Sequence, residues 1–222
     1  MQYLKISPLV IIFSLYAVSV NAETRNQVLA NVEEACAAAP ESCGAVLEQA
    51  MEQLLENETS LSSLATFTEK LVTRATAAAV AGGGNIAVIK SVAKATTTSV
   101  EKIKSVASSK GTLGVSGAAD RAAAKAVAVV ASAAKDLADS GKASASEATE
   151  AVAEIAEVAA ETVEPSRAAT LSTVAEAAAS GSVDLGSVSK AAESASNSVS
   201  EDTAPAETSD PAPTPTPDAS GN

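Results

Sequence analysis

The sequence predicts an all-α protein, a string or loose bundle of alanine-rich amphipathic helices followed by a disordered C-terminal tail. Alanine, the strongest helix former, makes up about a quarter of the 222 residues. Apolar residues recur at steps of three and four along most of the chain, which places them on one face of a helix. Glycine, proline and helix-capping residues separate these stretches. Because alanine buries little apolar area, we expect thin, elongated packing of modest stability.

The composition argues against several classes of function. A formal net charge of −12 is unfavourable for binding a phosphate backbone, so we expect no nucleic-acid partner. The chain has no histidine, which removes the usual proton shuttle near neutral pH, and no catalytic or phosphate-binding motif is recognisable. Without histidine, and with only two cysteines, the common zinc ligands are also missing. We therefore predict that the protein is not an enzyme and binds no cofactor or metal.

Residues 1–22 have the pattern of a secretory signal peptide. Lys5 and the amino terminus supply positive charge, residues 9–20 form an apolar core, and Val20 and Ala22 are the small residues that precede a cleavage site. An uncleaved membrane anchor is the alternative, although the apolar run is short for a complete span. No later segment is long and apolar enough to cross a bilayer. We expect a secreted or periplasmic protein.

Residues 23–81 are predicted to contain a helical hairpin joined by a disulfide. Apolar spacing indicates one helix from Thr24 to Pro40, a second from Val46 to Leu55, and a third that ends at the glycines of residues 82–84. Cys36 lies near the end of the first helix and Cys43 near the start of the second. In an exported protein the two cysteines are expected to form a disulfide, and a redox-active pair is the alternative.

Residues 85–200 are predicted to be an alanine-rich helical region. Asn85 caps a helix that continues to Ala107, and a helix over residues 119–137 follows after expected breaks at three glycines. Pro165 opens a further helix, and a weaker helical pattern covers residues 185–199. The three glycines expected to break the chain before the helix over residues 119–137 are Gly111, Gly114 and Gly117. The last segment, residues 201–222, is an acidic tail rich in proline and threonine, with no lysine or arginine, and is predicted to be disordered.

The helix predicted over residues 144–164 carries a stripe of glutamates. Ser144 and Glu147 fit a capping box at its start. The acids recur at three- and four-residue steps and so share one face: Glu147, Glu150, Glu154, Glu157, Glu161 and Glu164. This face could bind a divalent cation or a basic partner, or it could simply be solvated, although a straight helix cannot wrap an ion as calcium sites do.

The helix predicted over residues 85–110 is basic and is the expected partner of the acidic helix, within one molecule or between two. Its lysines Lys90, Lys94, Lys102 and Lys104 form, with the glutamates, the candidate interaction face. An alternative is that this helix and the glycine-containing run before it form a membrane-surface element. Asn57-Glu58-Thr59 also fits an N-glycosylation acceptor in a turn.

Together these patterns predict an exported, non-enzymatic structural or interaction protein, such as a helical spacer, an envelope or matrix component, or a scaffold that docks helix on helix. Its partners would be a second copy or another protein. The alternative is a surface-active protein whose amphipathic helices adsorb to a membrane or another interface.

Overall fold

The computed structural model describes residues 22–57, 60–112, 114–180 and 184–197, and these form eight α-helices and one short 3-10 helix. The elements in chain order are α1 (Ala22–Ala38), η1 (Pro40–Ser42), α2 (Cys43–Asn57), α3 (Leu61–Ala81), α4 (Ile86–Lys110), α5 (Val115–Asp139), α6 (Ala145–Thr162), α7 (Pro165–Ala179) and α8 (Leu185–Asn197). No strand occurs within these residues. The predicted all-α class is confirmed.

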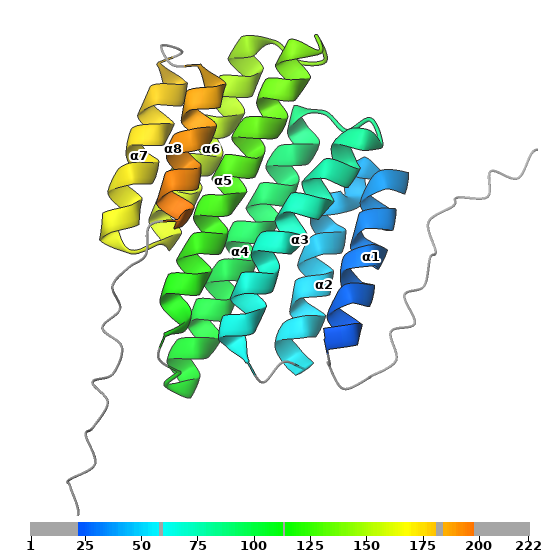
Figure 1. Ribbon diagram of the computed structural model, residues 1–222, viewed down its shortest axis with the longest axis vertical. Coiled ribbons are helices and arrows are strands. Elements are labelled where there is room, and N and C mark those ends of the chain that lie inside the picture. Colours follow the sequence, from blue (N-terminus) through cyan, green and yellow to red (C-terminus); the bar gives the residue numbers. More distant parts are fainter. Residues whose placement is uncertain (1–21, 58–59, 113, 181–183, 198–222) are drawn as a thin grey trace, which may run out of the picture.

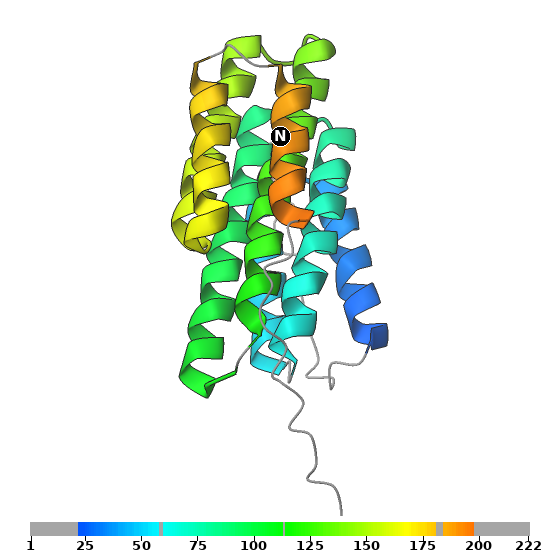
Figure 2. The same cartoon turned by 60° about the vertical axis from the view of Figure 1, so that its left-hand side comes forward.

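The helices pack side by side into one bundle, with the N-terminal helices along one edge and α6, α7 and α8 along the other (Figures 1 and 2). Helix α5 lies at the centre and packs against α3, α4, α6 and α8. A single hydrophobic cluster extends from Val28 in α1 to Ala195 in α8. The chain is therefore a bundle with a shared core and not an open string of helices.

The core is built mainly from alanine and valine. On α5, alanines 122–124 and 126 have no solvent exposure, so this helix is buried around most of its circumference at that level. Larger side chains such as Leu47, Leu71 and Ile103 fill the spaces on the neighbouring helices. Because alanine keeps helix backbones close together, the packing is tight although each residue removes little apolar surface from water.

Local signals fix most helix ends. The side chain of Asn85 accepts a hydrogen bond of 3.2 Å from the Val88 amide and caps α4, while Gly111 ends α4 with a φ of +62°. The predicted capping box of α6 is present: Glu147 N–H donates to Ser144 Oγ at 3.1 Å, and Ser144 N–H donates to Glu147 Oε2 at 2.8 Å. Pro165 occupies the first turn of α7.

Two sequence predictions about glycine and glutamate need correction. Gly117 does not break the chain, because it lies inside α5 with helical backbone geometry. Glu164 does not lie on the face of α6, because that helix ends at Thr162 and Glu164 is the N-cap of α7. Pro165 forces its preceding residue into extended geometry, which ends α6 before Glu164.

Three sequence predictions fall wholly or partly outside the described residues. They are the signal peptide of residues 1–22, of which only Ala22 is described, the tail of residues 201–222, and the triplet that begins at Asn57. Asn57 itself is the exposed last residue of α2. In the part of the chain that is described, no helix has the length and apolarity needed to span a membrane.

Candidate interaction surfaces and a buried ionic cluster

The lysine helix α4 packs between two acidic helices. It carries five lysines and one glutamate, whereas α6 carries five glutamates and no base, and α2 carries three glutamates and no base. Helix α4 contacts both of them. Lys90 pairs with Glu154 of α6, and Lys102 Nζ lies 3.1 Å from Glu48 Oε1 and 2.5 Å from Glu52 Oε1 of α2. The positive charge of α4 is thus matched on two sides.

The predicted interaction face consists of glutamates of the predicted acidic helix and lysines of α4. Among the described contacts, Lys90 and Glu154 are the one lysine and glutamate of this face that form an ion pair. Lys104 instead turns inward, and Lys94 is exposed to solvent. On α6, the carboxylates of Glu150, Glu157 and Glu161 are on the exposed side of the helix. These acids therefore form a solvated face in the isolated chain.

At the surface, Lys102 and Glu147 have pKa values that are shifted by identifiable hydrogen bonds. Hydrogen bonds to Glu52 and then to Glu48 raise the pKa of Lys102, because both acceptors favour the charged ammonium. Hydrogen bonds from the backbone amide and the hydroxyl of Ser144 lower the pKa of Glu147, because they favour its carboxylate. Both groups act structurally, since one links α4 to α2 and the other caps α6.

A buried ionic cluster lies where α4, α5 and the connection from α6 to α7 meet. The side chain of Asp120 on α5 has no solvent exposure. Its Oδ1 accepts a hydrogen bond of 2.8 Å from Lys104 Nζ, and its Oδ2 accepts one of 3.0 Å from the Glu164 amide. Lys104 Nζ also donates to the Thr162 carbonyl at 2.6 Å. The cluster therefore fastens the end of α6 to α4 and α5.

Arg167 of α7 extends this cluster to the last helix. Its guanidinium is almost fully buried, and Nη1 lies 3.8 Å from Asp120 Oδ2. Nε donates to the Ala195 carbonyl of α8 at 3.2 Å, and Nη1 donates to the Gly117 carbonyl of α5 at 3.4 Å. Because a buried charge needs both a counterion and hydrogen bonds, these contacts explain how an arginine is accommodated in an alanine core.

Sequence reasoning did not single out Asp120 or Arg167. The signal that points to Asp120 is its position in α5, since it follows two buried alanines and lies one helical turn before Ala124. A lone acid within an apolar stretch predicts a buried partner but does not identify it. With both carboxylate oxygens occupied, Asp120 acts as a structural anchor in this arrangement.

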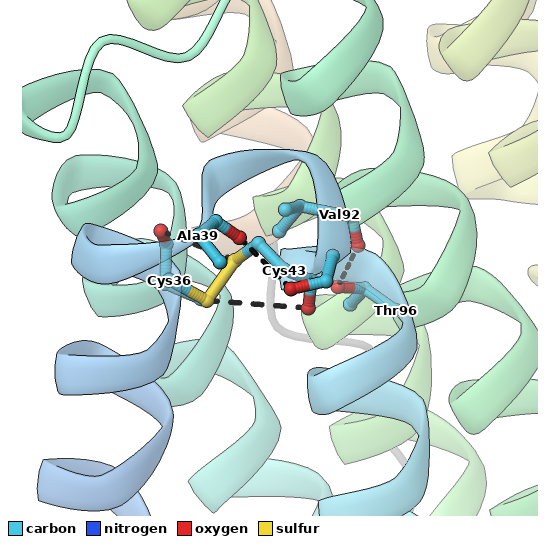
Figure 3. Close-up of a disulfide and its surroundings, with 7 residues drawn as sticks. Cys36, Ala39, Cys43, Val92 and Thr96 are labelled. Atoms are coloured by element: carbon cyan, nitrogen blue, oxygen red, sulfur yellow. Dashed lines mark hydrogen bonds between the residues drawn. A yellow bond between two sulfur atoms is a disulfide. The ribbon is translucent and has the colours of Figure 1, made fainter. Parts of the chain in front are cut away.

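A disulfide joins Cys36 at the end of α1 to Cys43 at the start of α2 (Figure 3). Both cysteines have no solvent exposure, and their Cα atoms are 4.6 Å apart. The bond lies beside α4, where the Thr96 hydroxyl donates to the Val92 carbonyl at 2.9 Å. A buried bond is poorly accessible to thiols, which favours a structural role over the redox alternative.

Within the described part of the chain, no group of three or more acidic or cysteine side chains is arranged to hold a metal ion. Comparisons with protein-family models, curated proteins and solved structures find no match for this chain.

Proposed function

We propose that this chain is an exported, non-enzymatic structural or interaction protein, which acts as a preformed helical module. The observation that carries the proposal is the shared core, in which the apolar faces of all eight described helices pack against one another. Such a module presents polar helix faces at fixed positions, and its contacts with other molecules are made by surfaces on a rigid bundle.

The burial of the apolar face of α4 favours this function over adsorption to membranes or other interfaces. A surface-active helix must offer its apolar face to the interface. In α4 the apolar side chains of Ile89, Val100 and Ile103 have no solvent exposure. Its lysines are also partly engaged, because Lys90 and Lys102 form ion pairs with α6 and α2. Adsorption would require the bundle to open first.

Export is supported by the signal-like start of the sequence and by the disulfide, since such bonds persist in oxidising compartments. Expression of the full chain with its own leader tests export directly. Intact-mass analysis of the released product should give a chain that starts near Glu23 and lacks free thiols. A product that retains residues 1–22, or two free thiols, would contradict this part of the proposal.

Circular dichroism of the chain from Glu23 onward, with and without anionic vesicles, tests the choice between the two functions. We expect full helicity without lipid, no change when vesicles are added, and no protein in the lipid fraction after flotation. Helix that forms only with lipid would favour the surface-active alternative. The control is Ile103→Asp, which places a charge in the core and opens the bundle. If only the opened variant floats with vesicles, the native fold is what prevents adsorption.

A further inference from the structure

A groove of about 720 Å³ lies on the face formed by α3, α5 and α8. Helix α5 forms its floor with residues such as Ala128, Val129 and Ser132, while Ala77 and Val80 of α3 form one wall. Figure 1 shows α8, α5 and α3 side by side on this face. Small side chains line most of the groove, so a helix laid into it could approach closely, as helices do inside this bundle.

One wall of the groove contains an unsatisfied polar group. Thr76 of α3 is 2% exposed, and its hydroxyl has no hydrogen-bond partner within the described structure. Other threonines of α3 behave differently: the hydroxyls of Thr66, Thr68 and Thr73 each donate to the carbonyl one turn earlier. Buried hydroxyls are normally bonded, so Thr76 is an unusual group behind the wall of the groove, and its oxygen is covered in the single chain.

Helix α8 is a projection beside this recess. On its other side, a second hollow of about 360 Å³ lies between α8 and α7. Helix α8 has 13 residues and is thus about 20 Å long. A twofold interface uses the same patch on both subunits, so each projection must meet a matching recess. A ridge with a groove beside it on one face meets that condition.

Charge also distinguishes this face from the acidic face of α6. The chain as a whole carries −12, and α6 presents five acids without a base, so two acidic faces would repel each other. The groove is lined by three lysines and two acids: Lys125, Lys135, Lys190, Asp136 and Glu193. It is therefore a face on which two copies can meet without a large repulsion.

We propose that a second copy of this chain docks on the face formed by α3, α5 and α8, with α8 of each copy lying in the groove of the other. With the two α8 helices antiparallel about a twofold axis, Lys190 of one copy faces Glu193 of the other, and the reverse pair forms by symmetry. Glu193 already lies 3.1 Å from Lys125, so each carboxylate would bridge two lysines. The small side chains of the groove supply most of the contact, and the ion pairs set its orientation.

This inference rests on the proposed function as an interaction module, and the partner it names is a second copy of the chain. Sedimentation equilibrium of the chain from Glu23 onward, over a range of concentrations, should show a reversible equilibrium between one and two chains. Ala77→Arg should raise the dissociation constant at least about tenfold, because it places a large side chain in the groove. Ala77 is exposed in the single chain, so helicity should not change.

The matched control is Ala30→Arg, an exposed alanine of α1 that lies outside the groove, and it should leave the dimer intact. Lys190→Glu provides a second test that does not depend on bulk, and it should weaken the dimer most at low salt. A mass of one chain at every concentration up to about 1 mM would overturn the inference. A dimer that survives both Ala77→Arg and Lys190→Glu would also overturn it. If the chain is a monomer at every concentration but is folded and does not bind vesicles, the dimer is excluded and the proposed function still stands.

Discussion

Asp120 places a negative charge in a core that is built mainly from apolar side chains. Transfer of a carboxylate from water into such surroundings is unfavourable unless its oxygens receive hydrogen bonds and a positive charge lies near. Here Lys104 and the Glu164 amide supply the hydrogen bonds, and the Arg167 guanidinium lies 3.8 Å away. The consequence is that each member of the cluster depends on the others, since removal of one leaves a buried charge exposed to an apolar medium.

We predict that Asp120→Asn destabilises the fold by about 3 kcal/mol or more, because it leaves Arg167 buried without a counterion. Urea unfolding followed by circular dichroism measures the change. Glu150→Gln, an exposed position on α6 away from the cluster, should change the free energy of unfolding by less than about 0.5 kcal/mol. Equal effects for the two substitutions would show that the cluster contributes no special stability.

Glu147 should make the stability of α6 depend on pH. Hydrogen bonds from Ser144 lower its pKa in the folded state, so its contribution is present above the pKa of the unfolded chain and is lost as pH falls through the folded value. We therefore expect Glu147→Ala to lower the melting temperature at pH 7 and to make no difference at about pH 2. Glu150→Ala is the control, since Glu150 is exposed and outside the capping box. A difference between Glu147→Ala and the unmodified chain that persists at low pH would contradict this cause.

The residues of the buried cluster lay beyond sequence reasoning for a physical reason. Asp120 and Arg167 are 47 positions apart, and their nearest charged neighbours along the chain, Arg121 and Glu164, do not indicate this pair. Their contact depends on how α5 and α7 pack, which local periodicity does not specify. The disulfide could be predicted because the chain contains only two cysteines, so that pairing has a single solution.

At the scale of the helices, caps and breakers predicted the ends well because they act within one turn. Asn85, Ser144 and Pro165 all serve as expected. Gly117 does not, since a glycine inside a long alanine-rich stretch weakens a helix without ending it. Of the two acidic partners of α4, only α6 could be predicted from its charge. Helix α2 has fewer acids, so its ion pair with Lys102 was not predicted.

The ion pair between Lys90 and Glu154 predicts different effects for two nearby glutamates of α6. Glu154→Lys sets a lysine beside Lys90, so we expect a lower melting temperature at low salt and a loss of about 0.5 to 1 kcal/mol. Glu157→Lys should be neutral or stabilising, because Glu157 is exposed among other acids of the stripe. Thermal melts at low and high salt measure both. If the double change Glu154→Lys, Glu157→Lys raises the melting temperature at low salt, α4 and α6 do not depend on the Lys90 pair.

Two helical glycines should respond in opposite ways to alanine. A Cβ added at Gly44 would lie 2.1 Å from Ser91 Oγ and 2.9 Å from the Ser91 carbonyl oxygen, so α2 and α4 would have to separate, at a loss of about 1 to 3 kcal/mol. A Cβ at Gly117 would meet nothing within 4 Å, so Gly117→Ala should stabilise by about 0.5 to 1 kcal/mol. Chemical unfolding of the two variants compares them. A gain in stability for Gly44→Ala would contradict the close approach of α2 to α4.

For the whole molecule, composition and periodicity predicted the helical class, while the arrangement of the helices could not be derived. Alanine stripes on different helices are nearly alike, so they do not specify which helix is central. The structure places α5 in that position, with α3, α4, α6 and α8 around it. Only the shape and charge of the complete helices, acting over long sequence separations, select this order.

We predict that the segment after Val199 is dispensable for the fold, because it combines five prolines with five acids and no base in residues 201–222. Truncation after Val199 should change the melting temperature by less than about 2 °C. Truncation after Val188 is the comparison, since it removes Ala192 and Ala195, which are buried in the core. It should lower the melting temperature clearly. A similar loss for both truncations would show that the C-terminal segment contributes to the fold.

The buried carboxylate of α5 also determines the register of the bundle. Since alanine recurs along every side of α5, sliding this helix by one turn would exchange many small side chains for similar ones, and only a few larger ones such as Val130 and Leu137 would resist it. The same slide would carry Asp120 about 5 Å along the helix axis, away from Lys104, the Glu164 amide and Arg167 together. The similar small side chains of α5 fit several alignments of this helix. The charge of Asp120 fits only the alignment in which it meets its partners on the other elements.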